Sequence, residues 1–309
     1  MEFTNRSCSD WSEIAECLNE FSPPETAILN DGEIATKAWV FRGHRCSGYG
    51  LQPGIERAAA SKSMEWPALE TLVSSEFKAR ARTHLSAPLI PEDELTWLAV
   101  MQHYAIPTRL LDFSYSPFVG LYFAIRDGHD DLKRSHVRLW AIDAGAVNER
   151  FQRVAWKAAA QDRKGEVRGP IVASLHPDDF ATDRDNMTGE TEGLRALIDE
   201  SLTATGRRRG ELNRSGCVCV ASPPAFNPRL VSQQGVFLIN CAEGVNFGDS
   251  LTKMMKGCSG WGRTFDIPVE LIPEIEGRLL QMNVHEQSLF PDLEGLAGLI
   301  RQKIRLQWK

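Results

Sequence analysis

The stretch from Met101 to Ala124 constrains the fold of this 309-residue chain more than any other. Thr108 to Phe113 is a short apolar run that follows a proline, which is typical of a buried strand. Ser116 and Pro117 then suit the N-cap and the first position of a helix, because proline lacks an N–H that the first turn leaves unpaired anyway. Helical spacing places four apolar side chains on one face of that helix: Phe118, Leu121, Tyr122 and Ile125. The stretch therefore predicts a buried strand that leads directly into an amphipathic helix.

The corner between this strand and this helix suits either packing or ligand binding. Ser114 and Ser116 lie where hydroxyl and backbone N–H groups can meet an anionic ligand. A well-packed joint with two capping serines explains the same residues, and the local pattern alone favours this simpler interpretation.

Apolar periodicity predicts further elements on both sides of this corner. Helices are expected at Asp10–Phe21 (capped by Asp10), Met64–Leu85 (capped by Ser63, with Leu69, Leu72, Val73 and Phe77 on its inner face), Glu92–Tyr104, Asn148–Ala160, Glu190–Thr205 and Leu293–Gln302 (capped by Asp292). Strands are expected at Ala38–Gly43, Val137–Ile142, Cys217–Ala221, Val236–Ile239 and Phe265–Leu271. The chain from Arg109 to Ile142 consequently has a strand–helix–strand pattern.

Two polar residues stand at the ends of predicted elements. Arg42 ends an apolar strand, where a guanidinium needs a partner. That partner is either an acidic neighbour or a phosphate, which the planar fork of arginine binds with two hydrogen bonds. His103 precedes the corner at Pro107 and has no metal-spaced companion, so it suits an orienting residue better than a metal ligand.

A pair of glutamines opens the strand at Val236–Ile239. Gln233 and Gln234 precede Gly235 at the mouth of this strand, where their amide groups can enter a cleft or bond the edge of the sheet. Both alternatives fit the pattern.

Composition excludes several classes of protein. A net charge of −6 gives no general basic field, and the local run Arg207–Arg209 is of a kind that is usually solvated surface. No apolar run approaches the roughly 18 residues of a membrane-spanning helix, and the N-terminus lacks an apolar signal segment. Seven scattered cysteines suit reduced thiols, and Cys217 and Cys219 would point to opposite faces of a strand. We therefore expect a cytoplasmic protein with no membrane association and no metal.

Several of these segments together resemble the bacterial FRG domain family. The resemblance rests on Phe41-Arg42-Gly43, Leu51-Gln52-Pro53, Arg57, the stretch from Met101 to Ala124, and the stretch from Leu289 to Ile300. It implies an N-terminal helical segment at residues 1–37 and an FRG domain at residues 38–309, with a charge-rich insertion at about 144–222.

The order of motifs is also similar to ADP-ribosyltransferases of the arginine–serine–glutamate class. This resemblance implies that Arg42 grips the phosphates of NAD, which is a substrate, and that Ser114 belongs to the middle motif. It implies catalytic roles for Arg42, His103, Ser114 and Gln234, and binding roles for Arg42, Gly43, Arg109, Ser114, Ser116 and Tyr122. Gln234 or Gly235 stands where the family has its catalytic glutamate. Asp112 and Glu243 are the carboxylates nearest in sequence that could replace it.

We accordingly expect an α+β fold with a mixed, split β-sheet around a central cleft and helices outside. The expected function is an NAD-dependent ADP-ribosyltransferase or NAD-cleaving effector, in bacterial anti-phage defence or a toxin–antitoxin system. It would act on a nucleotide-type small molecule and a protein or nucleic-acid acceptor. A nucleotide- or ADP-ribose-binding module without catalysis is the first alternative, and an effector that contacts nucleic acid through Arg207–Arg209 is the second. The sequence does not identify the acceptor or the oligomeric state.

Overall fold

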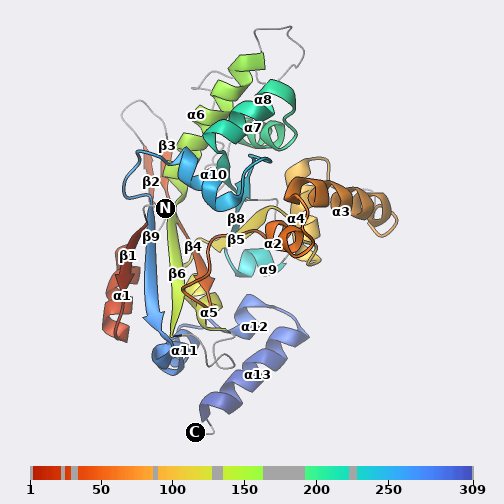
Figure 1. Ribbon diagram of the computed structural model, residues 1–309. Coiled ribbons are helices and arrows are strands. Elements are labelled where there is room, and N and C mark those ends of the chain that lie inside the picture. Colours follow the sequence, from red (N-terminus) through yellow and green to blue (C-terminus); the bar gives the residue numbers. More distant parts are fainter. Residues whose placement is uncertain are drawn as a thin grey trace.

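Seven strands join into one mixed sheet, in the order β1-β9-β6-β4-β5-β8-β7 (Figure 1). The computed structural model describes residues 3–21, 25–28, 34–85, 90–126, 135–162, 192–222 and 228–307. The strands of the sheet are β1 (Thr4–Ser7), β4 (Trp39–His44), β5 (Leu110–Ser114), β6 (His136–Asp143), β7 (Val218–Ala221), β8 (Gly235–Asn240) and β9 (Gly262–Pro268). A separate antiparallel pair is formed by β2 (Glu25–Ile28) and β3 (Ile34–Lys37). The fold is therefore α+β with a mixed sheet, as expected.

The sheet is weakly joined at its centre. Strand β4 pairs with β6 over six residue pairs, from Trp39 to His44, but with β5 through one pair only, Phe41 with Ser114. Because β4 is antiparallel to both neighbours, β5 and β6 run in the same direction with β4 between them. The predicted strand–helix–strand unit is thus confirmed, and its two strands are separated by a third that comes earlier in the chain.

Helices cover both faces of the sheet because strand residues alternate between two cores. One core takes Val40, Trp140 and Ile142 from the strands and side chains from α6 (Ala144–Asp162), α7 (Glu192–Leu202), α8 (Gly206–Ser215) and α10 (Phe247–Met254). The other takes Phe41, Leu139 and Ala141, with side chains from α1 (Trp11–Asn19), α5 (Pro117–Ile125) and α11 (Ile272–Gln281). The remaining helical elements are α2 (Gly54–Ser61), α3 (Trp66–Ala81), α4 (Glu94–His103), α9 (Pro228–Ser232), η3 (Val269–Leu271), α12 (Glu286–Leu289) and α13 (Leu293–Gln307).

Helix α5 is the central helix, and more of its residues are buried than the helical spacing of its apolar side chains predicts. Ser116 caps it as predicted, accepting a hydrogen bond from the backbone N–H of Val119. Of the expected apolar positions, Leu121, Tyr122 and Ile125 are buried and Phe118 is partly buried. Val119, Gly120 and Ala124 are buried too, so the prediction of a single apolar face was wrong. The reason is tertiary: α5 lies against β4 and β6 on one side and α11 on another.

Two glycines allow α5 to lie directly on β4. A Cβ atom on Gly43 would come within 2.1 Å of the carbonyl oxygen of Gly120. A Cβ on Gly120 would come within 2.8 Å of the Cβ of Phe41. Only glycine at both positions permits this close crossing of backbone on backbone.

Most predicted boundaries hold within a few residues, but the predicted N-cap of α3 was wrong. The predicted N-cap Ser63 has a φ of 52° and lies in the turn before the helix, whose N-cap is Glu65. Leu72, expected on the inner face, is 61% exposed, because α3 packs on α2 and α4 rather than on the sheet. The caps at Asp10 and Asp292 are confirmed, since they accept from the backbone N–H groups of Glu13 and Gly295.

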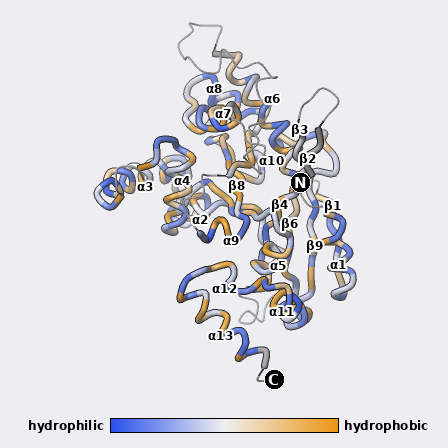
Figure 2. The backbone as a smooth tube through the Cα atoms, turned by 180° about the vertical axis from the view of Figure 1, so that it is seen from behind, coloured by the Kyte–Doolittle hydropathy of each residue, from blue (hydrophilic) through white to orange (hydrophobic). Residues whose placement is uncertain are grey.

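The N-terminal segment forms part of the main sheet. Strand β1 pairs in parallel with β9, and Ile14 and Leu18 of α1 are buried in the core. Within the segment expected to be an insertion, β7 also belongs to the sheet, and residues 163–191 lie outside the described part of the chain. Hydrophobic and hydrophilic residues alternate along the backbone of α13, which lies at the end of the molecule opposite α6, α7 and α8 (Figure 2).

Candidate functional site

A cavity of about 340 Å³ opens where β4 and β5 separate. We call it the β4/β5 cavity. It is lined by Phe41, Arg42, Gly43, Asp112, Phe113, Ser114, Phe123, Arg126, Gln233 and Phe290. Its size and its mixture of aromatic and polar walls are those of a small-molecule site. The two strands pair only at Phe41 and Ser114, and Ser114 is the last residue of β5. The neighbouring unpaired residues of the two strands line the cavity.

Arg42 spans the gap between the two strands with its side chain. Its Nη1 donates to the backbone carbonyl of Asp112 at 2.6 Å and lies 3.9 Å from the Asp112 carboxylate. Its Nε donates to Nε2 of His44 at 3.0 Å. Within the described residues Nη2 has no hydrogen bond, and the side chain is one-fifth exposed. Arg42 therefore has a structural role on one edge of its guanidinium and a donor free for a ligand on the other.

His44 is held neutral behind Arg42. Burial, together with the positive charge of Arg42, lowers the pKa of His44 to about 4. Its Nδ1 lies between the indole N–H of Trp140, at 3.1 Å, and the carbonyl oxygen of Tyr49, at 3.3 Å. With Nε2 as an acceptor, the neutral ring fixes the direction of the Arg42 guanidinium.

Asp112 supplies a carboxylate to the cavity. Its Oδ2 accepts from Nε2 of Gln102 at 2.9 Å, and Oε1 of Gln102 in turn accepts from the Thr108 hydroxyl at 2.7 Å. The side chain is 62% exposed, so this fixed carboxylate faces solvent at the cavity mouth. The other carboxylate considered from the sequence, Glu243, does not line the cavity and pairs with Arg109.

Both serines of the strand–helix corner are used for structure. The Ser114 hydroxyl donates to the carbonyl of Gln233 at 2.7 Å and accepts from the backbone N–H of Ser116 at 3.0 Å. Ser116 caps α5. Ser114 lines the cavity, but its hydroxyl ties β5 to the turn before β8.

The glutamine that lines the cavity is Gln233. Gln234 has a φ of 47° and an exposed side chain, and its carbonyl accepts from the backbone N–H of Tyr115 at 3.0 Å. This left-handed turn directs the two side chains differently, and Nε2 of Gln233 donates to the carbonyl of Leu289 at 3.1 Å. Gln234 is therefore next to Ser114 through the backbone while its side chain is not among those lining the cavity.

Three other residues predicted for the site lie away from this cavity. Arg109 is buried, bonds Glu70 at 2.6 Å through Nε, and stacks 5.1 Å from the ring of Trp66. His103 is exposed at the end of α4, beside the ring of Tyr104. The hydroxyl of Tyr122 bonds Glu286 on α12.

Sequence reasoning missed Arg126, Phe123 and Phe290. The Arg126 guanidinium lies 4.4 Å from the centre of the Phe290 ring and forms an ion pair with Glu286. Arg126 follows Tyr122 by one helical turn, which is the signal that could have placed it on the same side of α5. Phe290 comes from a segment 164 residues later than Arg126, so no local pattern could connect the two.

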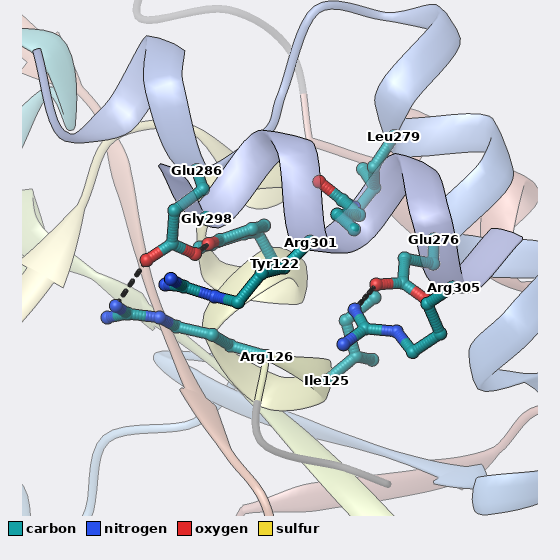
Figure 3. A pocket seen from close by; sticks show the side chains of 10 residues that line it. Tyr122, Ile125, Arg126, Glu276, Leu279, Glu286, Gly298, Arg301 and Arg305 are labelled. Atoms are coloured by element: carbon teal, nitrogen blue, oxygen red, sulfur yellow. Dashed lines mark hydrogen bonds and ion pairs between the residues drawn. The ribbon is translucent and has the colours of Figure 1, made fainter. Parts of the chain in front are cut away.

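A second cavity of about 330 Å³ adjoins the first, because Arg126 lines both. It lies between α5, α11, α12 and α13, and charged side chains project into it from these helices (Figure 3). In neither cavity, nor elsewhere in the described chain, is a group of three or more His, Cys, Asp or Glu placed to hold a metal ion.

Comparison with known proteins identifies one segment. Residues 37–133 match the FRG domain. The resemblance to FRG domains is thereby confirmed for this segment, which supplies Arg42, Asp112, Ser114 and Arg126 to the β4/β5 cavity. No curated protein and no solved structure matches the chain. Among the described helices, none has the length and apolar character needed to cross a membrane.

Proposed function

We propose that the β4/β5 cavity binds NAD and that the protein is an NAD-dependent ADP-ribosyltransferase or an NAD-cleaving effector. The observation that carries the proposal is the combination of two guanidinium groups, Arg42 and Arg126, with the carboxylate of Asp112 around one cavity. Arginine forks match the oxygens of a pyrophosphate, and the rings of Phe123 and Phe290 offer apolar walls for a base.

The proposed reaction breaks the bond between nicotinamide and ribose. Nicotinamide leaves with the bonding electron pair, and the ribose carbon takes on positive charge. A carboxylate fixed beside that carbon stabilises the charge, and Asp112 is the group in the cavity that can do so. Water or a nucleophile of a protein or nucleic-acid acceptor then bonds the same carbon and loses a proton.

A binding module without catalysis is the alternative that a specific observation favours. The hydroxyl of Ser114 is already committed to the Gln233 carbonyl. The position of the glutamate in ADP-ribosyltransferases falls either on Gln234, whose side chain is exposed, or on Gly235. The same guanidinium and aromatic groups would then hold a nucleotide or ADP-ribose without turnover.

Nicotinamide release from NAD and affinity for ADP-ribose, measured side by side, separate the two functions. We expect wild type to release nicotinamide, and Asp112→Asn to lower the rate by about 10²–10³ while it retains ADP-ribose affinity. Arg42→Ala should lose both properties. Arg80→Ala, which removes a guanidinium that is 78% exposed on α3, is the matched control and should resemble wild type.

The outcomes are distinct. ADP-ribose binding without nicotinamide release would identify a binding module, and the absence of both in wild type would refute the proposal.

The basic run Arg207–Arg209 favours neither function. It lies at the start of α8, where Arg208 pairs with Glu200 at 2.7 Å and Arg209 pairs with Glu243 at 2.9 Å. Two of its three charges are thus offset by acidic neighbours, which weakens the case for a nucleic-acid effector.

For an NAD-consuming enzyme we propose a cytoplasmic role in bacterial anti-phage defence or a toxin–antitoxin system, as the family resemblance implies.

A further inference from the structure

The second cavity contains one positive charge more than its ion pairs account for. Arg126 pairs with Glu286, and Arg305 pairs with Glu276 (Figure 3). Arg301 projects from α13 into the same cavity and has no ion pair or hydrogen bond with any residue in the described part of the chain. The cavity therefore presents an uncompensated guanidinium beside two that are compensated.

The packing of α13 keeps Glu286 in its place. A Cβ on Gly298 would come within 2.2 Å of the Cγ of Glu286, so the helix backbone lies directly against this side chain. The Glu286 carboxylate is also bonded by the Tyr122 hydroxyl and by Arg126. Each oxygen of the Glu286 carboxylate thus has a partner, and among the described residues no ion pair joins Glu286 to Arg301.

Gln302 adds a second unsatisfied group to the same cavity. The residue is only 5% exposed, and its Oε1 has no hydrogen-bond partner among the described residues. A buried amide oxygen without a donor is unfavourable. It is consistent with a ligand that brings a hydroxyl group to this position.

We propose that the second cavity is a binding site for a phosphate-bearing small molecule, with Arg301 as its principal contact. The guanidinium matches the anionic oxygens, and a hydroxyl of the ligand donates to Gln302. Apolar side chains of Ile125 and Leu279 complete the walls. This site is separate from the proposed NAD site, and because Arg126 lines both cavities, a ligand in one is positioned to influence the other.

Inorganic phosphate is the probe, with thermal unfolding and calorimetric titration of the full chain as readouts. Sodium phosphate should raise the midpoint of unfolding above that in sodium chloride of equal ionic strength, because a ligand of the folded state stabilises it. Arg301→Ala should weaken phosphate binding about tenfold or more, as expected when a charged hydrogen-bond donor is lost. Acetate, which has no hydroxyl group to donate, should bind more weakly than phosphate.

A control on the same helix locates the effect. Lys303→Ala removes an exposed charge that does not line the cavity, and it should bind phosphate as wild type does, whatever the outcome for NAD. The inference is overturned if wild type shows no preference for phosphate over chloride or acetate. It is also overturned if Arg301→Ala retains the affinity, or if Lys303→Ala loses it.

Discussion

Arg42 makes two hydrogen bonds that a single lysine ammonium cannot make together. It reaches the carbonyl of Asp112 with Nη1 and the ring of His44 with Nε. We expect Arg42→Lys to lose ADP-ribose affinity nearly as fully as Arg42→Ala, and to lower the free energy of unfolding by about 1–3 kcal/mol. Calorimetric titration and denaturant unfolding measure these effects, with Arg80→Lys as control. A lysine variant that binds like wild type would mean that only the charge matters.

Glu56 on α2 should make stability depend on pH. It is 5% exposed, its carboxylate accepts from the backbone N–H of Phe247 at 2.6 Å, and burial raises its pKa from 4.5 to about 7. The folded protein thus holds this proton more tightly than the unfolded chain does, so the free energy of unfolding falls as pH rises between these values.

Glu56→Gln keeps the acceptor and removes this titration. Relative to wild type, we expect the unfolding free energy of the variant to rise between about pH 5 and about pH 8 by up to about 3 kcal/mol. Denaturant unfolding at the two pH values provides the measurement. A difference between variant and wild type that does not change with pH would contradict the assignment.

Gln234 provides a test of the resemblance to ADP-ribosyltransferases. A glutamate at the position where those enzymes have their catalytic glutamate would raise nicotinamide release if that side chain faced the ribose. Because the Gln234 side chain is exposed and does not line the β4/β5 cavity, we expect Gln234→Glu to leave release and ADP-ribose affinity unchanged. A rate increase in the same assay would show that the turn before β8 rearranges when ligand binds.

At the scale of elements, β4 and α5 cross so closely that no space is left for an added side-chain atom at Gly120. Gly120→Ala would place a Cβ 2.8 Å from the Cβ of Phe41, and we expect it to lower the free energy of unfolding by about 2 kcal/mol. Gly277→Ala on α11 is the matched control, since a Cβ there meets nothing within 4 Å, and it should stabilise the helix by up to about 1 kcal/mol. Chemical denaturation compares the two. If both variants changed the free energy of unfolding equally, helix propensity rather than the close crossing of β4 and α5 would determine the effect.

Local signals predicted elements well where caps and prolines mark them, and tertiary packing decided the rest. Ser116 and Pro117 located α5 because an N-cap and a first-turn proline act on their own neighbours. The exposure of Leu72 could not be predicted, because α3 packs on helices rather than on the sheet. In the candidate site, Arg42 and Ser114 were found from strand ends. The position of Phe290 in the cavity depends on contacts between distant segments and could not be predicted. That Gln233 rather than Gln234 lines the cavity depends on the left-handed backbone of Gln234 and on the contact of Gln233 with Leu289.

At the scale of the whole molecule, the segment that matches the FRG domain contains only part of the sheet. Residues 37–133 contain β4 and β5, which share one residue pair, while their main partners β6 and β8 lie later in the chain. We expect a fragment of residues 37–133 to lack a cooperative unfolding transition that the full chain shows. Circular dichroism during heating tests this. A cooperative transition in the fragment would show that the segment folds without the rest of the sheet.

The tripeptide Phe41-Arg42-Gly43 combines three unrelated requirements within one strand. Phe41 fills the core, Gly43 makes room for a helix, and only Arg42 brings polar groups to the cavity. In this chain the tripeptide is therefore mainly a way of packing a strand under a helix, which is compatible with many reactions. An activity assigned to another protein from the tripeptide alone would rest on this packing, so the residues equivalent to Asp112 and Arg126 would have to be compared first.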